Sequence, residues 1–222
     1  MSNIVSVSGG KDSTAMLLKM IEENIKIDRI LFADTGLELP ETYEFINKLS
    51  DYCKKRIGIR ITKLKSNRDW DYYFYRVIQK GKYKGNIRGF PKVTFKCWWQ
   101  RDCKDKLLSK RAGKYDTVFI GFAKDEEKRC KIGTNQRYPL VEWGMTEQDC
   151  MDYCKEKGML NPLYEKYGFK RLGCWCCPKQ PIRDLKIIRD YYPDLWTRLL
   201  KYEQDSPHGF KPNFKLKELS KK

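Results

Sequence analysis

Residues 4–14, with the sequence Ile-Val-Ser-Val-Ser-Gly-Gly-Lys-Asp-Ser-Thr, constrain the fold of this chain more than any other stretch. The β-branched run at 4–7 predicts a short buried strand, and a helical pattern follows at 15–21. A strand that passes through a glycine turn into a helix points backbone N–H groups at an anion. Gly9 and Gly10 let the backbone approach a phosphate, because no Cβ intervenes.

The polar side chains of this turn suit the same purpose. The hydroxyl groups of Ser8 and Ser13 can donate hydrogen bonds, and Lys11 adds a positive charge. Asp12 and Ser13 also suit the first turn of a helix. The spacing is not that of a Walker loop, which requires Gly-x-x-x-x-Gly-Lys-Ser/Thr. The sequence therefore predicts an anion-binding turn of another kind.

The hexapeptide Ser-Gly-Gly-Lys-Asp-Ser resembles the pyrophosphate loop of the N-type ATP pyrophosphatases. The resemblance implies that this loop holds the phosphates of ATP or an equivalent anion, and that AMP is transferred to a substrate. Mg²⁺ would help to neutralise the phosphates, with Asp12 as the nearest carboxylate. The alternative is an ordinary glycine-rich turn between a strand and a helix. The implied cofactor-binding residues are Ser8, Gly9, Gly10, Lys11, Asp12 and Ser13, with Lys11 and Asp12 also assigned to catalysis.

A second strand, at 29–33, ends in Asp34-Thr35-Gly36 and precedes a helix at 43–52. Strands that alternate with helices, with polar residues at the strand ends, predict an α/β fold: a parallel, twisted sheet with flanking helices and a site at its carboxyl edge. The stretch from Leu31 to Phe45 is similar to the second motif of the phosphoadenosine-phosphosulfate (PAPS) reductase branch of the same superfamily. The resemblance implies an adenine nucleotide α-hydrolase-like fold in which Asp34, Thr35 and Gly36 border the nucleotide.

Later segments extend this resemblance to about residues 3–200. A strand at 115–120 is followed by Gly121 and then by an acidic pair with Arg129, as in the family, which implies that Arg129 meets the anionic end of the nucleotide. The alternative for Arg129 is a charged loop. Further family-like segments lie at 143–146, 161–164 and 173–178. Other expected elements are a strand at 57–64 and helices at 70–80, 104–110 and 147–157.

The net charge of +17 is concentrated in the middle of the chain. Residues 1–53 carry 5 Lys/Arg and 9 Asp/Glu, residues 54–115 carry 20 and 4, and residues 116–222 carry 21 and 16. Aromatic residues interleave with the basic residues of 54–115, which suits phosphate backbones and stacked bases and favours tRNA or DNA as a partner. The alternatives are a solvated basic face whose aromatics form core, and a charge that attracts an anionic nucleotide.

No apolar run reaches the ~20 residues of a membrane span, and the N-terminus is not that of a signal peptide. A cytoplasmic location is therefore expected, where disulfides are rare. In that compartment, the nine cysteines argue for metal binding or catalysis. Cys97 and Cys103 with the Cys-x-x-Cys pair Cys174 and Cys177 provide four ligands for a tetrahedral all-sulfur site. Zinc and a 4Fe-4S cluster both accept such a set. Cys176 is a further candidate ligand or a free thiol.

The resemblance favours iron–sulfur, since adenylylsulfate reductases and phosphorothioation proteins of this branch hold 4Fe-4S clusters. Adenylylsulfate reductases use an adjacent Cys-Cys pair and a distant Cys-x-x-Cys, whereas this chain has Cys-x5-Cys at 97–103. Because of that departure, the sequence does not decide between an iron–sulfur cluster, zinc and the absence of a metal.

The expected organisation is a nucleotide-binding α/β domain at 1–145, with a basic insertion at 54–115, and a small, helical, cysteine-containing subdomain at 146–222. The first functional hypothesis is ATP-dependent adenylyl activation coupled to sulfur transfer on a nucleic acid, with a sulfur donor protein. The second is reduction of PAPS or adenylylsulfate (APS) with an unusual or external thiol, either Cys176 or a cysteine of a partner protein. Reductases of this branch use a cysteine in a C-terminal tail, and no cysteine follows Cys177 here. The third is a non-catalytic nucleotide or nucleic-acid binding subunit.

Overall fold

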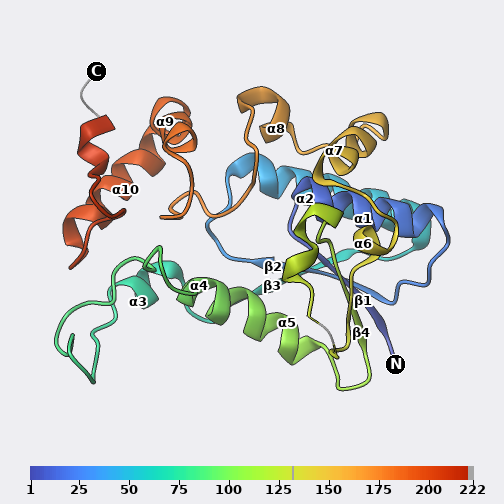
Figure 1. The fold of residues 1–222 in the computed structure, drawn as a ribbon, viewed down its shortest axis with the longest axis horizontal. Coiled ribbons are helices and arrows are strands. Elements are labelled where there is room, and N and C mark those ends of the chain that lie inside the picture. The colour runs from blue at the N-terminus through green and yellow to red at the C-terminus, as the bar shows by residue number, and fades with distance from the viewer. Residues whose placement is uncertain (132, 220–222) are drawn as a thin grey trace. The chain divides into compact units, whose positions relative to one another are not determined.

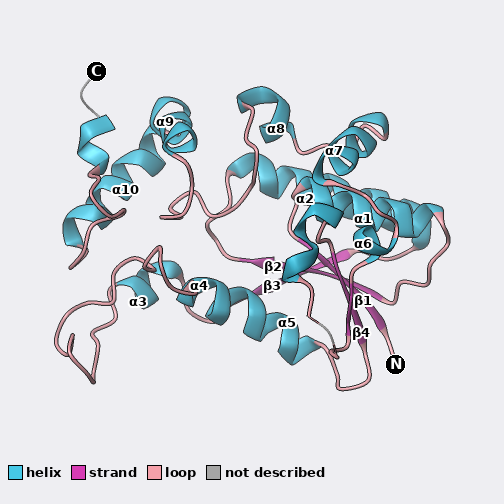
Figure 2. Ribbon diagram, in the orientation of Figure 1, coloured by secondary structure: helices cyan, strands magenta, loops and turns pink. Residues whose placement is uncertain are grey.

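A computed structural model describes residues 1–131 and 133–219. The chain contains a sheet of five parallel strands in the order β3-β2-β1-β4-β5, which Figures 1 and 2 show with its flanking helices. The chain builds β2 and β3 on one side of β1, and then β4 and β5 on the other. The strand order therefore reverses beside β1, which is where open α/β sheets bind ligands. The strands are β1 (Asn3–Val7), β2 (Arg29–Asp34), β3 (Ile61–Lys65), β4 (Thr117–Ile120) and β5 (Gln136–Arg137).

The chain forms two compact units that interleave along the sequence. The first unit comprises Met1–Asp34, Leu39–Lys65 and Asp105–Leu172, and the second comprises Thr35–Glu38, Ser66–Lys104 and Gly173–Lys222. This division differs from the expected boundary at residue 145, because α7 (Glu147–Glu156) packs with α1 (Lys11–Glu22) in the core of the first unit. Residues 220–222 of the expected C-terminal subdomain lie outside the described residues.

Helices cover both faces of the sheet in the first unit (Figure 1). The side chains of Val5 and Phe32 pack into a large core with α1, α2 (Pro40–Ile57) and α7. On the opposite face, Ile4 and Leu31 pack against residues of α5 (Lys106–Arg111). Burial on both faces explains why the strands are continuous apolar runs in the sequence. The other helices of this unit are α6 (Pro139–Glu142), α8 (Pro162–Tyr167) and a 3₁₀ helix at Lys124–Arg129.

Two of the expected elements have different bounds in the structure, so their predicted extents were wrong. The alternation at 57–64 predicted a strand, but α2 continues to Ile57 and ends at Gly58, whose φ of 75° is left-handed, so β3 begins only at Ile61. The expected helix at 70–80 ends after one turn as α3 (Trp70–Phe74). Beyond it, Val77 forms an antiparallel bridge with Ile87.

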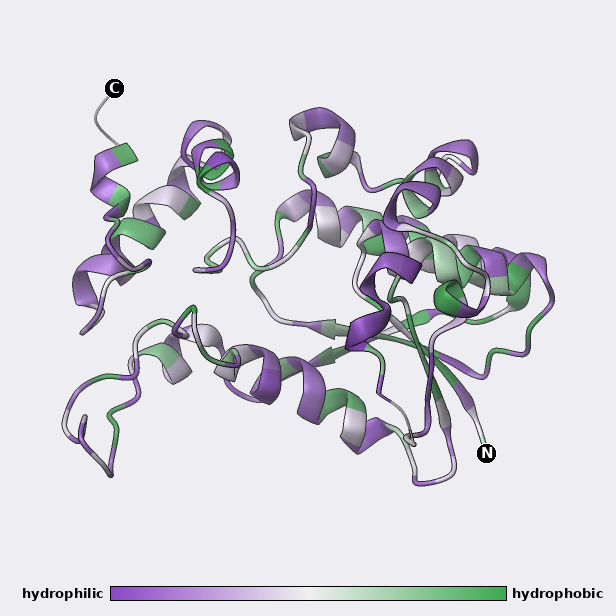
Figure 3. Ribbon diagram, in the orientation of Figure 1, coloured by the Kyte–Doolittle hydropathy of each residue, from purple (hydrophilic) through white to green (hydrophobic). Residues whose placement is uncertain are grey.

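The second unit is built around aromatic side chains. The Trp70 ring lies 5.1–6.3 Å, between centroids, from five other rings, which belong to Phe74, Phe90, Trp98, Trp99 and Tyr202. Its amphipathic helices α9 (Ile182–Tyr191) and α10 (Pro193–Asp205) carry both hydrophilic and hydrophobic residues (Figure 3). Its remaining elements are α4 (Trp98–Gln100), a π-helical turn at Arg101–Asp105 and a 3₁₀ helix at Leu216–Leu219.

Among the described residues, no helix combines the length and the apolar character that crossing a bilayer requires.

Candidate functional site

The predicted anion-binding turn lies between β1 and α1, at the carboxyl end of the sheet where the strand order reverses. α1 begins at Lys11, and its N-cap residue Gly10 provides no side-chain hydrogen bond to the helix. The hydroxyl of Ser13 accepts from the Ser8 amide at 3.1 Å, lies 3.1 Å from the Ser8 hydroxyl and donates to the Gly10 carbonyl at 3.2 Å. The two serines predicted to contact phosphate thus also hold the turn in shape.

Two buried residues from the start of α8 hold the same turn. Asn161, which is 1% exposed, donates to the carbonyl of Gly9 at 3.1 Å. The hydroxyl of Tyr164 accepts from the Lys11 amide at 3.1 Å. Gly9 has a φ of +78°, which favours glycine. In the sequence, 161–164 is recognisable only as a family-like segment, and nothing pairs that segment with residues 8–13.

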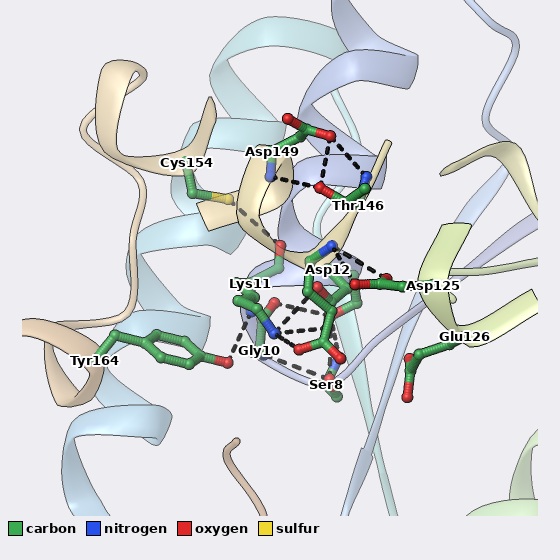
Figure 4. A network of polar contacts seen from close by, with 12 residues as sticks. Ser8, Gly10, Lys11, Asp12, Asp125, Glu126, Thr146, Asp149, Cys154 and Tyr164 are labelled. Atoms are coloured by element: carbon green, nitrogen blue, oxygen red, sulfur yellow. Dashed lines mark hydrogen bonds and ion pairs between the residues drawn. The ribbon is translucent and has the colours of Figure 1, made fainter. Parts of the chain in front are cut away.

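Lys11 is buried and is held by two carboxylates, as Figure 4 shows around its ammonium group. Its Nζ lies 3.3 Å from Asp12 and 2.5 Å from Glu147, the first residue of α7. Burial lowers the pKa of Lys11, but the hydrogen bond to Glu147 and the charge of Asp12 raise it above its ordinary value. Lys11 is therefore charged, and nothing in the sequence marks Glu147 as its partner.

Asp12 has an unusual protonation equilibrium. Burial raises the pKa of this carboxyl to about 6, against the opposing effect of the Lys11 charge, and the negative charge of Glu147 raises it further. Its Oδ1 atom is buried, and its only close polar neighbour among the described residues is the Lys11 ammonium group at 3.3 Å. Asp12 is thus a carboxylate that changes its charge near neutral pH.

Asp12 should make the protein less stable as the pH rises. The folded protein binds this proton more tightly than the unfolded chain does, so the free energy of unfolding should fall between about pH 4 and pH 6. The fall attributable to this group is about 1 to 3 kcal/mol. Urea unfolding of wild type and Asp12→Asn at pH 4 and pH 7 measures it, with exposed Asp51→Asn as the control. A difference between wild type and Asp12→Asn that is the same at both pH values would contradict the assignment.

Gly121, at the end of β4, has a packing role that the sequence did not reveal. A Cβ at this position would lie 2.7 Å from the Cα and 2.8 Å from the amide nitrogen of Ser13. Only glycine therefore lets the end of β4 lie against the first turn of α1. In the structure Gly121 lies against the first turn of α1, and a contact of Gly121 with the nucleotide stays a prediction.

Arg129 lies on the 3₁₀ helix that follows β4. Its guanidinium forms an ion pair with Glu126 and lies 4.1 Å from the ring centroid of Phe122. The same segment reaches α7, because the Asp125 carboxylate accepts a hydrogen bond from the Glu147 amide at 3.2 Å (Figure 4). A role of Arg129 toward an anion remains a prediction.

The Asp34-Thr35-Gly36 segment is divided between the two units. In the first unit, the buried Asp34 carboxylate accepts from the Tyr43 hydroxyl at 3.0 Å and lies 3.4 Å from the Lys65 ammonium. In the second unit, the Thr35 hydroxyl donates to the Glu38 carboxylate at 3.0 Å. A contact of this segment with a nucleotide stays a prediction.

The four cysteines predicted to bind metal all lie in the second unit. The amide of Cys177 donates to the Cys174 carbonyl at 3.0 Å, so these two residues share a tight turn. Burial raises the pKa of Cys103 to about 11, and the charge of Cys97 acts in the same direction. Over 1–131 and 133–219, however, no three or more His, Cys, Asp or Glu residues form a group that could hold a metal ion. The four thiols therefore do not form a metal-binding group in the part of the chain that the structure describes.

A lysine connects the second pair to the rest of this unit. Lys104, which follows Cys103, lies 3.4 Å from the Glu38 carboxylate. Burial lowers the pKa of Lys104, but the charge of Glu38 outweighs it and raises the pKa. Burial and the charge of Glu38 raise the pKa of Cys174 above its ordinary range. The Cys174 thiol is therefore protonated at neutral pH.

The parallel sheet, with a turn from strand to helix where the strand order reverses, defines an α/β protein of the class that binds its ligands at that point. Residues 2–180 match the model of the phosphoadenosine phosphosulfate reductase domain, and the chain belongs to that family. A phosphoadenosine 5'-phosphosulfate reductase of Alteromonas mediterranea is 26% identical over 184 residues, covering 78% of this chain and 68% of that protein.

Other relatives are longer than this chain. An uncharacterized protein of Methanocaldococcus jannaschii is 28% identical over 219 residues, which cover 90% of this chain and 48% of that protein. A second uncharacterized protein of that organism is 28% identical over 210 residues, which cover 88% of this chain and 40% of that protein. The chain thus spans about half the length of these relatives or less.

A solved structure has the same fold. The crystal structure of phosphoadenylyl-sulfate reductase from Candida auris, a phosphate complex, matches with a TM-score of 0.51 and 17% identity, over 79% of this chain and 82% of that one. The predicted α/β fold with a parallel sheet is thereby confirmed, whereas the predicted family is confirmed by the match of residues 2–180 to the family model.

Proposed function

We propose that this chain binds ATP with its phosphates at the β1–α1 turn and transfers the adenylyl group to an acceptor, with release of pyrophosphate. The observation that carries the proposal is the buried ammonium group of Lys11 at the start of α1, beside the backbone of a Gly-Gly turn. A helix N-terminus with a fixed cation favours phosphate groups. The Candida auris reductase, a protein of the same fold, was crystallised as a phosphate complex.

The proposed reaction exchanges one bond to phosphorus for another. An oxygen of the acceptor attacks the α-phosphorus, the bond from that phosphorus to the bridging oxygen breaks, and pyrophosphate leaves with the bonding electrons. The backbone of residues 8–13 and Lys11 would stabilise the charge of the leaving group. Asp12 would provide a carboxylate for Mg²⁺, which neutralises phosphate charge when it is bound.

Pyrophosphate release from ATP tests this proposal. Purified protein with Mg·ATP, in the presence of tRNA or DNA, should release pyrophosphate, and Asp12→Ala should lower that rate by about 100-fold, as for loss of a group that contacts the metal and phosphates. Asp51→Ala, at an exposed residue of α2 that pairs with Arg60, is the matched control and should keep the wild-type rate. No release above the blank, or equal rates for wild type and Asp12→Ala, would contradict the proposal.

The second candidate is reduction of PAPS or APS, which the similarity to named PAPS reductases favours. This reaction requires a nucleophilic thiolate. Burial raises the pKa of Cys176 well above its ordinary value, so this thiol is a poor nucleophile. Sulfite formation from PAPS with reduced thioredoxin, without pyrophosphate release from ATP, would select this candidate over adenylyl transfer.

We also propose that the acceptor is a nucleic acid and that a sulfur donor protein completes the reaction. Trp70, Phe74 and Phe90 of the basic segment are buried in the second unit, so the alternative that these aromatics form core is correct for them. Tyr72 and Tyr83 are exposed, with Arg68 and Lys92 each 4.7 Å from their ring centroids. Exposed rings with adjacent cations suit base stacking beside phosphates.

A metal at the cysteines of the second unit is a separate proposal. Cys97, Cys103, Cys174 and Cys177 would have to converge from their two pairs to hold zinc or a 4Fe-4S cluster, which would supply a thiolate-bound metal centre. The iron, zinc and sulfide content of anaerobically purified protein decides between these metals and none.

A further inference from the structure

Glu147 gives the proposed phosphate site an anion of its own. Its carboxylate oxygen lies 2.5 Å from the Nζ of Lys11, and the Lys11 side chain is only 6% exposed. The second partner of Lys11 is Asp12 at 3.3 Å. One ammonium group is thus surrounded by two carboxylates, so the turn carries a net negative charge whenever Asp12 is ionised.

Hydrogen bonds hold the backbone that carries Glu147, whereas its side chain is partly exposed. The Thr146 side chain accepts from the Asp149 amide at 3.2 Å and the Asp149 carboxylate accepts from the Thr146 amide at 2.8 Å, which closes a capping box at the start of α7. Asp125 accepts from the Glu147 amide. The Glu147 side chain is 43% exposed, so it can turn away into solvent without disturbing α7.

We infer that the Glu147 carboxylate pairs with the Lys11 ammonium group in the nucleotide-free protein and must move away from it before a phosphate group can bind there. This inference rests on the proposed phosphate site. An anionic ligand and Glu147 compete for the same ammonium group, and two carboxylates beside a phosphate repel it. Glu147 is therefore a positioning residue that lowers the affinity of the turn for phosphate, and ligands with several phosphate charges overcome it best.

A role of Glu147 in binding a divalent cation predicts the opposite change in phosphate affinity. If its carboxylate instead bound a divalent cation that bridges to the phosphates, removing its charge would weaken binding. Measuring affinity in EDTA and in Mg²⁺ separates the two roles, because competition for Lys11 requires no cation.

Isothermal titration of wild type and Glu147→Gln with inorganic pyrophosphate and with ATP in EDTA tests the inference. We expect about 3- to 10-fold tighter binding by Glu147→Gln, which corresponds to about 0.7 to 1.4 kcal/mol. Adenosine, which carries no phosphate, should bind both proteins equally, whereas a purely structural effect would change its affinity too. Glu142→Gln, at an exposed glutamate that pairs with Arg137, is the matched control and should bind like wild type.

The outcomes separate the inference from the proposed function. Equal or weaker pyrophosphate binding by Glu147→Gln, while wild type binds ATP, would overturn the inference and leave the phosphate site in place. Absence of binding of both ATP and pyrophosphate to wild type, in EDTA and in Mg²⁺, would overturn the proposed function and the inference with it.

Discussion

Replacing Gly121 by alanine should lower the free energy of unfolding by about 2 to 3 kcal/mol and weaken phosphate binding at the β1–α1 turn. The added Cβ would lie 2.7 Å from the Ser13 Cα, 2.8 Å from the Ser13 nitrogen and 3.0 Å from the Asp12 carbonyl carbon. All three are backbone atoms, so no side chain can rotate to make room. The first turn of α1 or the end of β4 must move, and either change displaces the backbone that would face a phosphate.

Urea unfolding and pyrophosphate titration measure the two effects of Gly121→Ala. Gly113→Ala is the matched control, because the closest atom to its added Cβ is the Asp116 Oδ2 at 3.4 Å, which belongs to a side chain. We expect this control to change stability by less than about 1 kcal/mol. Equal stability of Gly121→Ala and Gly113→Ala would show that the close approach of β4 to α1 is not maintained in solution.

The sheet was predictable because its signals are local. Short apolar runs such as 29–33 are buried by helices on both sides, and a glycine turn marks where the first strand gives way to a helix. The error at Ile57 is also local, since three alternating isoleucines imitate a strand while Ile57 completes the last turn of α2 before the left-handed Gly58. Periodicity alone does not distinguish these two cases.

The contacts that define the candidate site were not predictable, because they join residues far apart in the sequence. Glu147 lies 136 residues from Lys11, and Asn161 lies 152 residues from Gly9. No spacing rule connects such residues, so only the fold reveals that they meet. The predicted turn at 8–13 supplied the chemistry of the site, and the fold supplied its acidic and hydrogen-bonding partners.

The aromatic residues of 66–104 show the same limit in the second unit. Basic residues between aromatic ones suggested exposed stacking surfaces, but Trp70 and Phe90 pack against other rings from the same unit, including Tyr202 of α10. Arg88 lies 4.1 Å from the Trp98 ring centroid, so even a cation beside an aromatic ring can belong to this packing. Composition identifies such residues without deciding whether a ligand or the protein covers them.

Replacing Lys11 by methionine should reduce the affinity for pyrophosphate by about 100-fold, or about 2.7 kcal/mol. Methionine fills similar space but removes the ammonium group, which could make charge-assisted hydrogen bonds to phosphate worth about 1.5 to 3 kcal/mol. The same change leaves Asp12 and Glu147 facing each other without a cation between them. Their repulsion adds to the loss, because a phosphate then approaches two unbalanced carboxylates.

Titration of Lys11→Met with pyrophosphate in EDTA provides the measurement, and Lys19→Met is its matched control. Lys19 lies on the same helix, pairs with Glu23 at 2.8 Å and lies 5.2 Å from the Trp143 ring centroid. Its loss should cost less than about 1 kcal/mol of stability and leave the affinity unchanged, since a helix ion pair of this spacing contributes only about 0.3–0.5 kcal/mol. If Lys11→Met binds pyrophosphate as tightly as Lys19→Met does, the phosphates bind elsewhere on the protein, and the pairing of Lys11 with two carboxylates serves only to hold α7 against α1.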